Sequence, residues 1–315
     1  MHPITHQSLR IVFMGTPDFA VASLDALVNA GYNIVGVVTA PDKPAGRGMK
    51  LQESAVKKYA LEKGFPVLQP VKLKNPEFLE ELKKLKADVQ VVVAFRMLPE
   101  QVWNMPPGGT INVHGSLLPQ YRGAAPINWA IINGEKETGV TTFMLKQEID
   151  TGDILLQTRL PIGEDETAGE LHDKMKMAGA ELLVETLQSF ITGNIRPKAQ
   201  TEILSPNDTH YQHAPRIFTE TCKINWDHKV DDIHNLIRGL SPFPGAYTFL
   251  DNKMIKVFKS EKERSVPATE AGSFDTDKKT FLKFAAGDGY ISIKELQMEG
   301  KKKMNISDFL RGYRF

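Results

Sequence analysis

The sequence predicts an α/β fold, in which an N-terminal domain with a mostly parallel sheet precedes a small C-terminal β-barrel. The chain has 315 residues, which is long for a single domain. Up to residue 191, short apolar runs alternate with helical patterns, as expected for parallel strands joined by crossover helices. After the Pro-containing stretch 193–215, the pattern changes to short strands separated by turns.

Composition narrows the class of protein. Hydrophobic residues make up 41% of the chain, which is enough for ordinary cores, and the net charge of +1 offers a nucleic acid only local basic patches. One cysteine, Cys222, excludes an intramolecular disulfide and a multi-cysteine zinc site, and it suits a reducing cytosol. There is no apolar run of the roughly 20 residues that span a membrane, and residues 1–8 lack a signal-peptide pattern. We therefore expect a cytoplasmic protein without membrane contact, and nothing in the sequence demands more than a monomer.

The elements of the N-terminal domain follow from apolar runs and their boundaries. Continuous β-branched runs predict buried parallel strands, and Gly, Pro and capping residues mark the helix ends. Pro17 and Asp18 suit a helix N-terminus that can hold an anion, but Gly15-Thr16 lacks a full dinucleotide fingerprint, so NAD is not predicted. The predicted strands are 9–14, 34–38, 67–68, 89–94, 140–145 and 153–160, and the predicted helices are 20–30, 54–63, 76–85, 126–132 and 167–191.

The C-terminal part begins after a linker. Helix-breaking residues between 193 and 215 place the domain boundary near residue 206, which gives domains 1–205 and 206–315. The spacing of apolar residues beyond it predicts a small barrel. Its predicted elements are a helix at 230–240 and strands at 246–250, 254–258, 281–284 and 289–296.

The stretch 110–126 carries the chemistry around which the domain is organised. Asn112 and His114 lie two residues apart in a predicted strand, so both side chains point to the same side. The strand should end near Gly115, and ligands bind at the carboxyl ends of the strands in an open α/β sheet. An amide can donate to a developing oxyanion, and an imidazole can move a proton near neutral pH.

An orienting carboxylate completes this group. Asp150 is the preferred candidate, because it lies in a Thr-Gly turn between two predicted strands. Glu148 and Asp153 flank it and are the alternatives. An amide, an imidazole and a carboxylate are sufficient to move an acyl group between nitrogens when the substrate supplies the amine.

These motifs resemble the signature of the folate-dependent formyltransferases. The matching residues are Asn112-x-His114, Ser116-Leu117-Leu118-Pro119, Arg122-Gly123 and Asp150-x-Gly152, and the segment Phe13–Phe19 resembles the opening of the tRNA-acting branch, the methionyl-tRNA formyltransferases. The resemblance implies transfer of the formyl group of 10-formyltetrahydrofolate to the α-amine of methionyl-initiator tRNA, for translation initiation and without a metal. It also implies a Rossmann-like catalytic domain and an OB-type C-terminal domain that binds tRNA.

The resemblance further implies roles for individual residues. It makes Asn112, His114 and Asp150 the catalytic group. It places the folate against two loops, which comprise Phe95, Arg96, Met97 and Leu98, and Ser116, Leu117, Leu118 and Pro119. Many tRNA-acting members have Gly where this chain has Arg96. We expect the Arg96 side chain to reach solvent, with pairing to the glutamate tail of the folate as the alternative.

The expected tRNA contacts lie mostly in the stretch 39–50. It has no periodicity, contains two Gly and two Pro, and matches an insertion that engages the acceptor arm in the tRNA-acting branch. The residues expected to contact tRNA are Lys43, Arg47, Lys50, Gly15, Thr16 and Arg122. The cluster Lys301–Lys303 reads as a solvated turn, with an RNA contact as the alternative.

Three other functions compete with this interpretation. They are formyl transfer to a small amine, as in a glycinamide ribonucleotide or amino-sugar nucleotide enzyme, folate hydrolysis, and RNA binding without catalysis. The presence of Asn112, His114 and Asp150 together argues against the last. The basic stretch 39–50 and the appended barrel argue against the first two, because a small amine needs neither.

Overall fold

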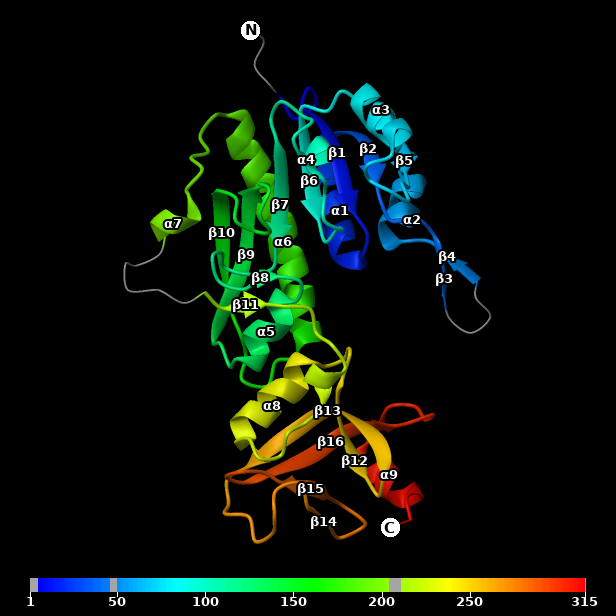
Figure 1. Ribbon diagram of the computed structural model, residues 1–315, viewed down its shortest axis with the longest axis vertical. Helices are drawn as coiled ribbons and strands as arrows, with labels where there is room; N and C mark the ends of the chain where they lie inside the picture. The colour runs from blue at the N-terminus through cyan, green and yellow to red at the C-terminus, as the bar shows by residue number, and fades with distance from the viewer. Residues whose placement is uncertain (1–4, 46–49, 204–210, 315) are drawn as a thin grey trace. The chain divides into compact units, whose positions relative to one another are not determined.

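The computed structural model describes residues 5–45, 50–203 and 211–314 (Figure 1). The chain divides into two compact units, one made of residues 1–122, 139–160 and 173–212, the other of 123–138, 161–172 and 213–315. We refer to them as the first and second unit. The predicted boundary between residues 205 and 206 lies outside the described residues and stays a prediction.

A seven-stranded sheet forms the centre of the first unit, with strand order β10-β9-β7-β6-β1-β2-β5. The five strands from β7 to β5 pair in parallel, and β9 pairs antiparallel with β7. Every apolar run predicted as a strand in this part of the chain forms one. The strands are β1 (Arg10–Gly15), β2 (Asn33–Val38), β5 (Val67–Leu68), β6 (Val89–Val93), β7 (Thr110–His114), β9 (Glu137–Met144) and β10 (Ile154–Pro161).

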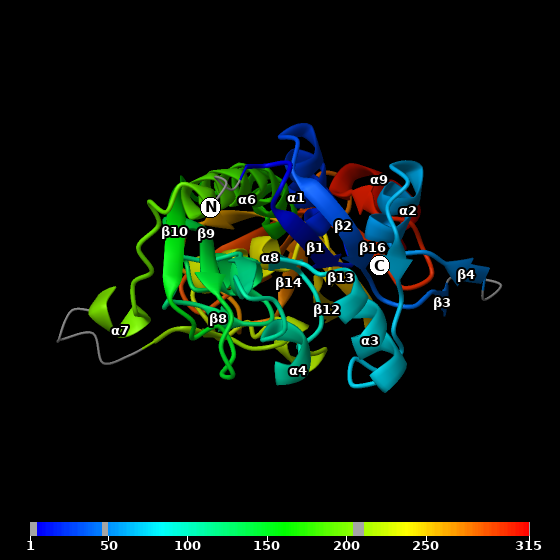
Figure 2. The same cartoon turned by 90° about the horizontal axis from the view of Figure 1, so that it is seen from above.

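Helices cover both faces of this sheet, with α1 and α6 on one face and α3 and α4 on the other (Figure 2). On the α3 side, Val12, Met14 and Val92 pack with Phe78 of α3 and Val102 of α4. On the other side, α6 approaches β7 so closely that a Cβ at its Gly179 would contact Val113. The helices are α1 (Asp18–Asn29), α2 (Ala55–Glu62), α3 (Pro76–Lys84), α4 (Glu100–Trp103), α6 (Ala168–Ile191) and α7 (Gln200–Ile203).

The strand order creates a switch point that positions the site. From β1, the chain adds β2 and β5 on one side, then returns to place β6 and β7 on the other. At the carboxyl ends, Gly15 of β1 is in register with Val93 of β6, and Val93 is in register with Val113 of β7. Ligands bind outside the carboxyl ends of strands at such a switch point. The segments that follow β1, β6 and β7 therefore share one edge of the sheet.

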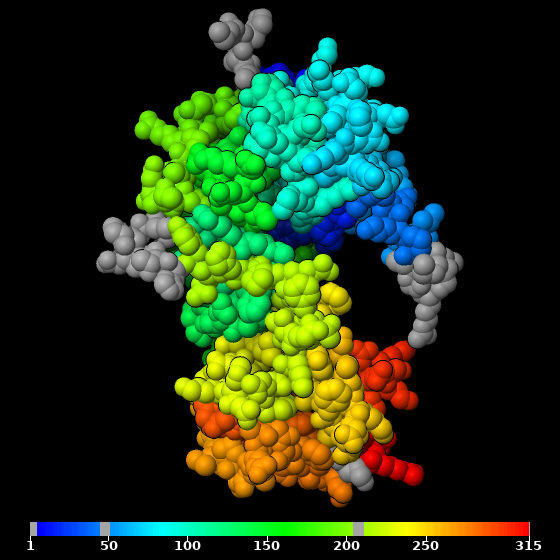
Figure 3. All heavy atoms as spheres, viewed as in Figure 1, coloured from blue at the N-terminus to red at the C-terminus, as the bar shows by residue number. Residues whose placement is uncertain are grey.

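The stretch predicted as an irregular loop at 39–50 contains a short hairpin, so that prediction was wrong. Strands β3 (Lys43–Ala45) and β4 (Lys50–Gln52) pair antiparallel, with Lys43 opposite Gln52. The hairpin projects from its unit (Figures 1 and 2), and its atoms are blue in the space-filling view (Figure 3). Strands this short carry no detectable alternation of apolar and polar residues, which is why the sequence pattern did not reveal them.

The second unit is built on an antiparallel sheet of order β12-β13-β16-β15-β14, with β17 paired to β16. It is a half-barrel, in which register shifts beside Lys259 interrupt the ladder between β13 and β16. Such bulges increase strand twist and bend. Helix α8 packs Val230 and Ile237 into the same core as Phe309 of α9. The remaining elements of the chain are β8 (Arg122–Gly123), α5 (Pro126–Ile132), β11 (His213–Ala214), the 3₁₀ turn η1 (Glu220–Cys222), α8 (Val230–Gly239), β12 (Ala246–Leu250), β13 (Lys253–Glu263), β14 (Phe274–Thr276), β15 (Leu282–Ala285), β16 (Tyr290–Met298), β17 (Met304–Asn305) and α9 (Ile306–Gly312).

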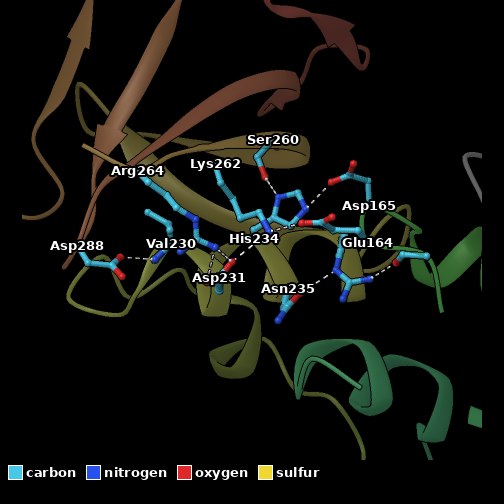
Figure 4. A network of polar contacts seen from close by, with 12 residues as sticks. Glu164, Asp165, Val230, Asp231, His234, Asn235, Ser260, Lys262, Arg264 and Asp288 are labelled. Carbon is cyan, nitrogen blue, oxygen red and sulfur yellow. Dashed lines mark hydrogen bonds and ion pairs between the residues drawn. The ribbon is translucent and has the colours of Figure 1, made fainter. Parts of the chain in front are cut away.

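A polar network around the buried ring of His234 ties segment 161–172 to α8 within the second unit (Figure 4). His234 is 3% exposed. Its Nε2 lies 3.1 Å from Asp165 Oδ1, and its Nδ1 lies 3.0 Å from Ser260 Oγ. Since a carboxylate oxygen accepts hydrogen bonds, Nε2 donates to Asp165 and Nδ1 accepts from the Ser260 hydroxyl. Burial lowers the pKa of His234, which favours this neutral form.

Among the described helices, none has both the length and the apolar character needed to cross a membrane.

Candidate active site

Strand β7 brings an amide and an imidazole to one edge of the sheet. It ends at His114, as predicted, and Asn112 and His114 alternate with the buried residues Ile111 and Val113. Asn112 is partly exposed, and its side chain has no hydrogen-bond partner among the residues that the structure describes. Its N–H groups and carbonyl oxygen are therefore available to a ligand.

The imidazole of His114 is held in one orientation. Its Nε2 lies 2.9 Å from the carbonyl oxygen of Tyr121. Because a carbonyl only accepts, Nε2 carries a proton and donates it in this bond. Nδ1 is then the ring nitrogen that gains or releases a proton. The edge-on ring of Phe143, with centroids 6.4 Å apart, packs against the imidazole, which is almost completely buried.

Asp150 lies in the turn between β9 and β10, and the backbone of this turn is unusual. Asp150 has a φ of 54°, in the left-handed region that Asp tolerates better than most residues. Two residues later, a Cβ at Gly152 would lie 1.6 Å from the carbonyl oxygen of Met144. The Asp-x-Gly spacing therefore has a steric origin, since only Gly fits the close approach at its third position.

This turn places the Asp150 carboxylate opposite the imidazole. Asp150 Oδ2 lies 3.7 Å from His114 Nδ1, beyond hydrogen-bond length but within ion-pair range, and its side chain is 13% exposed. The two alternative carboxylates are placed differently. Glu148 is exposed, and Asp153 pairs with Lys146 at 2.7 Å. Of the three acids considered from the sequence, Asp150 is the one that faces His114.

The predicted folate loop follows β6 on the same sheet edge. Ala94, with a φ of 46°, turns the chain out of the strand. Phe95 and Leu98 pack against the core on the α3 side, whereas Met97 is 72% exposed.

Arg96 in this loop does not extend into solvent, so that expectation was wrong. Its Nη1 donates to Val71 O at 2.9 Å, its Nη2 donates to Pro70 O, and its guanidinium lies over the Phe95 ring at 5.5 Å. Burial lowers the pKa of Arg96, and its Nε has no hydrogen-bond partner among the described residues. Arg96 fastens the loop to segment 70–71.

The second predicted folate segment is largely engaged in internal packing and hydrogen bonds. Ser116 is fully buried and donates through Oγ to Gln120 O at 2.6 Å, while Leu118 packs with Phe143 in a small core. Thr141 Oγ1 donates to Ser116 O and accepts from Leu118 N. Leu117 is partly exposed, and Pro119 is buried. The contact of this segment with folate stays a prediction.

The residues predicted to bind tRNA are dispersed over the first unit. Gly15 is the last residue of β1, and Thr16 follows the strand. A Cβ atom added at Gly15 would lie 2.6 Å from the Cβ atom of Ala20. Lys43 and Lys50 begin β3 and β4, and the Lys43 side chain is exposed. Arg47 lies outside the described residues. The base of the hairpin is fixed by Asp42, whose pKa is lowered by its hydrogen bond to Lys57.

Arg122, another predicted tRNA contact, pairs with side chains of its own unit. Its Nε and Nη2 donate to Gln200 Oε1 at 3.0 and 2.5 Å, and its guanidinium lies 5.0 Å from the centre of the Tyr211 ring. Sequence reasoning missed Gln200, which also bonds the backbone of the Asp150 turn. No pattern in the stretch 193–215 singled it out, because its partners are distant in the chain.

Among the described residues, no three His, Cys, Asp or Glu side chains gather in a group that could hold a metal ion.

Comparison with known proteins agrees with these motifs. Residues 9–187 match the formyl transferase family, and residues 216–314 match the formyl transferase C-terminal domain. A methionyl-tRNA formyltransferase of Bacteroides fragilis is 51% identical over 312 residues, which cover 98% of this chain and 96% of that protein.

Solved structures share the fold at lower identity. HypX from Aquifex aeolicus in complex with tetrahydrofolic acid has a TM-score of 0.66 and 18% identity. The match covers 98% of this chain but 48% of HypX, so the chain spans about half the length of that protein. An N-formyltransferase from Helicobacter canadensis, in complex with folinic acid and dTDP-3-aminofucose, has a TM-score of 0.66 and 22% identity over 93% of this chain and 99% of that one. Since the two family matches cover most of the chain and the Bacteroides fragilis relative aligns over nearly all of it, the chain belongs to the formyl transferase family.

Proposed function

We propose that the protein transfers the formyl group of 10-formyltetrahydrofolate to the α-amine of methionine esterified to initiator tRNA, the reaction that prepares this tRNA for translation initiation. The observation that carries the proposal is the facing pair of His114 Nδ1 and Asp150 Oδ2, 3.7 Å apart, on the same sheet edge as Asn112, whose amide has no hydrogen-bond partner among the described residues. The name of the Bacteroides fragilis relative supports methionyl-tRNA as the acceptor. The bound tetrahydrofolic acid of HypX and folinic acid of the Helicobacter protein support a folate as the donor.

Asn112 has the chemistry to stabilise charge on the formyl oxygen. As the amine attacks the formyl carbon, negative charge develops on this oxygen, and the Asn112 N–H donates to it. A side chain that makes no other hydrogen bond in the described structure needs no rearrangement to do so. Removing one such donor typically lowers the rate by about 10²–10³.

Asp150 and His114 transfer the proton that the attacking amine releases. The attacking amine loses a proton as its bond to the formyl carbon forms, and the Asp150 carboxylate accepts it. His114 donates through Nε2 to Tyr121, so only its Nδ1 is free to exchange a proton, and Nδ1 faces Asp150. The pair can thus hold the proton that N10 of the folate requires when its bond to the formyl carbon breaks.

Other parts of the molecule would hold the two substrates. The loop Phe95–Leu98 would contact the folate, and Lys43, Arg47 and Lys50 of the stretch 39–50 would contact tRNA phosphates, because phosphate contacts position a nucleic acid. We assign the half-barrel of the second unit to the OB type and to tRNA binding, as in the family. We further propose that the protein acts in the cytoplasm as a monomer.

A substrate panel tests the proposal. The purified protein is given 10-formyltetrahydrofolate with methionyl-initiator tRNA, with free methionine, or with an amino-sugar nucleotide, and formyl transfer is followed with labelled donor. We expect turnover with charged tRNA and background rates with both small amines. Turnover of the amino-sugar nucleotide, or donor hydrolysis that is independent of any amine, would reject the assignment.

A further inference from the structure

We propose that Gln200, the first residue of α7, is a positioning residue that holds the Asp150 turn in its working geometry. The inference rests on the proposed function, because it assigns Gln200 a role through Asp150. The residue is 3% exposed although it lies in a four-residue helix that follows an irregular segment.

Both ends of the Gln200 amide are fully used. Its Nε2 donates to Asp150 O and Gly152 O, each at 2.8 Å. Its Oε1 accepts from Arg122 Nε and Nη2 at 3.0 and 2.5 Å. An amide has two N–H donors and two acceptor sites, so its hydrogen-bonding capacity is exhausted. A buried group with complete pairing is costly to replace.

These bonds connect the Asp150 turn with Arg122, the neighbour of the residue that fixes the imidazole. Arg122 directly follows Tyr121, whose carbonyl fixes His114 Nε2. On its other side, Gln200 bonds the backbone of Asp150 itself. One side chain therefore links the supports of both members of the pair whose Nδ1 and Oδ2 lie 3.7 Å apart.

The Asp150 turn has need of such a support. Residues 146–149 are exposed, so the chain entering the turn has little packing to hold it. Asp150 is in the left-handed region, which an unrestrained non-glycine residue tends to leave. The carbonyls of Asp150 and Gly152 point to a common donor, and Gln200 is that donor.

Neither a carboxylate nor an ammonium group at position 200 could make all the hydrogen bonds of this amide. A carboxylate at position 200 would still pair with Arg122, but it would face two carbonyl oxygens with no proton to offer. An ammonium group would donate to the carbonyls and repel Arg122. The structure therefore makes Gln200→Glu a selective probe, which removes the contact with the turn and keeps the contact with Arg122.

The experiment compares Gln200→Glu with Gln188→Glu, the same substitution at an exposed position of α6. Steady-state formyl transfer to methionyl-tRNA is measured for the full chain. For Gln200→Glu we expect kcat to fall by about 10²-fold, the effect of misplacing a reacting group by about 1 Å, with both KM values nearly unchanged. Gln188→Glu should match the wild type. A normal kcat in Gln200→Glu, or a rise in KM alone, would refute the proposal.

A double variant distinguishes positioning from a general loss of structure. In an Asp150→Asn background, single-turnover rates should change little when Gln200→Glu is added, because the positioned group is already gone. If the two losses multiply, Gln200 acts elsewhere and the proposal is wrong. Should Gln200→Glu fail to fold, Gln200→Asn keeps the amide but shortens its reach, and it should show the same loss of kcat in weaker form.

Hydrogen exchange gives a readout that does not depend on the acceptor. Peptides that cover residues 147–153 should exchange faster in Gln200→Glu than in the wild type, while peptides of β16 should be unchanged. Unchanged exchange in the turn would overturn the positioning role. If the wild type transfers no formyl group to tRNA, the proposed function fails, and this measurement still decides whether Gln200 holds the turn.

Discussion

A Cβ atom at Gly152 would lie 1.6 Å from the carbonyl oxygen of Met144, at the end of β9. The obstacle is backbone in a paired strand, so it cannot rotate aside as a side chain could. The turn that presents Asp150 is therefore possible only with Gly at this position.

Gly152→Ala should accordingly destabilise the protein and displace Asp150. We expect the free energy of unfolding to fall by about 3 kcal/mol, the upper end of the usual range for overpacking. Urea denaturation followed by circular dichroism measures it. Gly312→Ala is the matched control, because its added Cβ would meet no atom within 4 Å among the described residues outside its own helix turn and chain neighbours. Equal stability of the two variants would show that the turn relaxes, contrary to the steric argument.

Arg96→Ala should weaken binding of the formyl donor. The substitution removes the two hydrogen bonds that fasten the loop Phe95–Leu98 to Pro70 and Val71. Hydrogen bonds of a charged donor contribute about 1.5–3 kcal/mol, so KM for the folate should rise about tenfold or more. KM for tRNA should not change. Arg96→Lys keeps the charge but loses the forked geometry of the guanidinium. Its KM for the folate should lie between the values of the wild type and of Arg96→Ala. A normal donor KM in Arg96→Ala would separate this loop from folate binding.

Arg47→Ala should impair the reaction with tRNA and spare the folate. A lost contact to the tRNA end raises KM or lowers kcat for methionyl-tRNA, and a lost phosphate contact reduces the salt dependence of binding. Kinetics at several salt concentrations measure both effects. Lys84→Ala on α3 removes the same charge from an exposed surface position and serves as the control. Unchanged tRNA kinetics in Arg47→Ala would reject the assignment of Arg47 to tRNA binding.

The stability of the protein should depend on pH through His234. Its pKa in the folded protein is lowered from the reference value of 6.5 by burial, and Lys262 and Arg238 add to this while Asp165 opposes it. Between the folded-state pKa and 6.5, the unfolded chain binds more protons, so the free energy of unfolding falls as the pH decreases. The slope contributed by one such group is at most about 1.4 kcal/mol per pH unit.

Urea unfolding as a function of pH tests this. His234→Gln should flatten the pH dependence of the free energy of unfolding below pH 6.5 relative to the wild type. An identical slope in wild type and His234→Gln would mean that His234 binds a proton equally well in both states.

Local sequence signals predicted most elements of the fold. Helix α5 begins at Pro126, because Pro at the first helical position and the apolar residues after it mark that end clearly. Helix α6 follows a capping box, in which Glu170 Oε2 accepts a hydrogen bond from Thr167 N at 2.8 Å. The elements missed are short, such as the hairpin strands and α4, where too few residues are available to establish a period.

The candidate site was predictable in its chemistry but not in its supports. The spacing of Asn112 and His114 determines that both leave β7 on one side, and the Asp150 turn follows the strand β9 that pairs with β7. The partners of Arg96 and the bonds of Gln200 join segments that are far apart in the chain. Such pairings depend on tertiary packing, and no local pattern encodes them.

The most direct test of the central claim is the single-turnover rate of formyl transfer to methionyl-tRNA by Asp150→Asn. This variant keeps the size and shape of the side chain opposite His114 Nδ1 but cannot take up the amine proton. We predict a rate at least about 10³-fold below that of the wild type, within the range for a lost general base, with an unchanged unfolding midpoint. A folded Asp150→Asn protein whose rate lies within about tenfold of wild type would contradict the account.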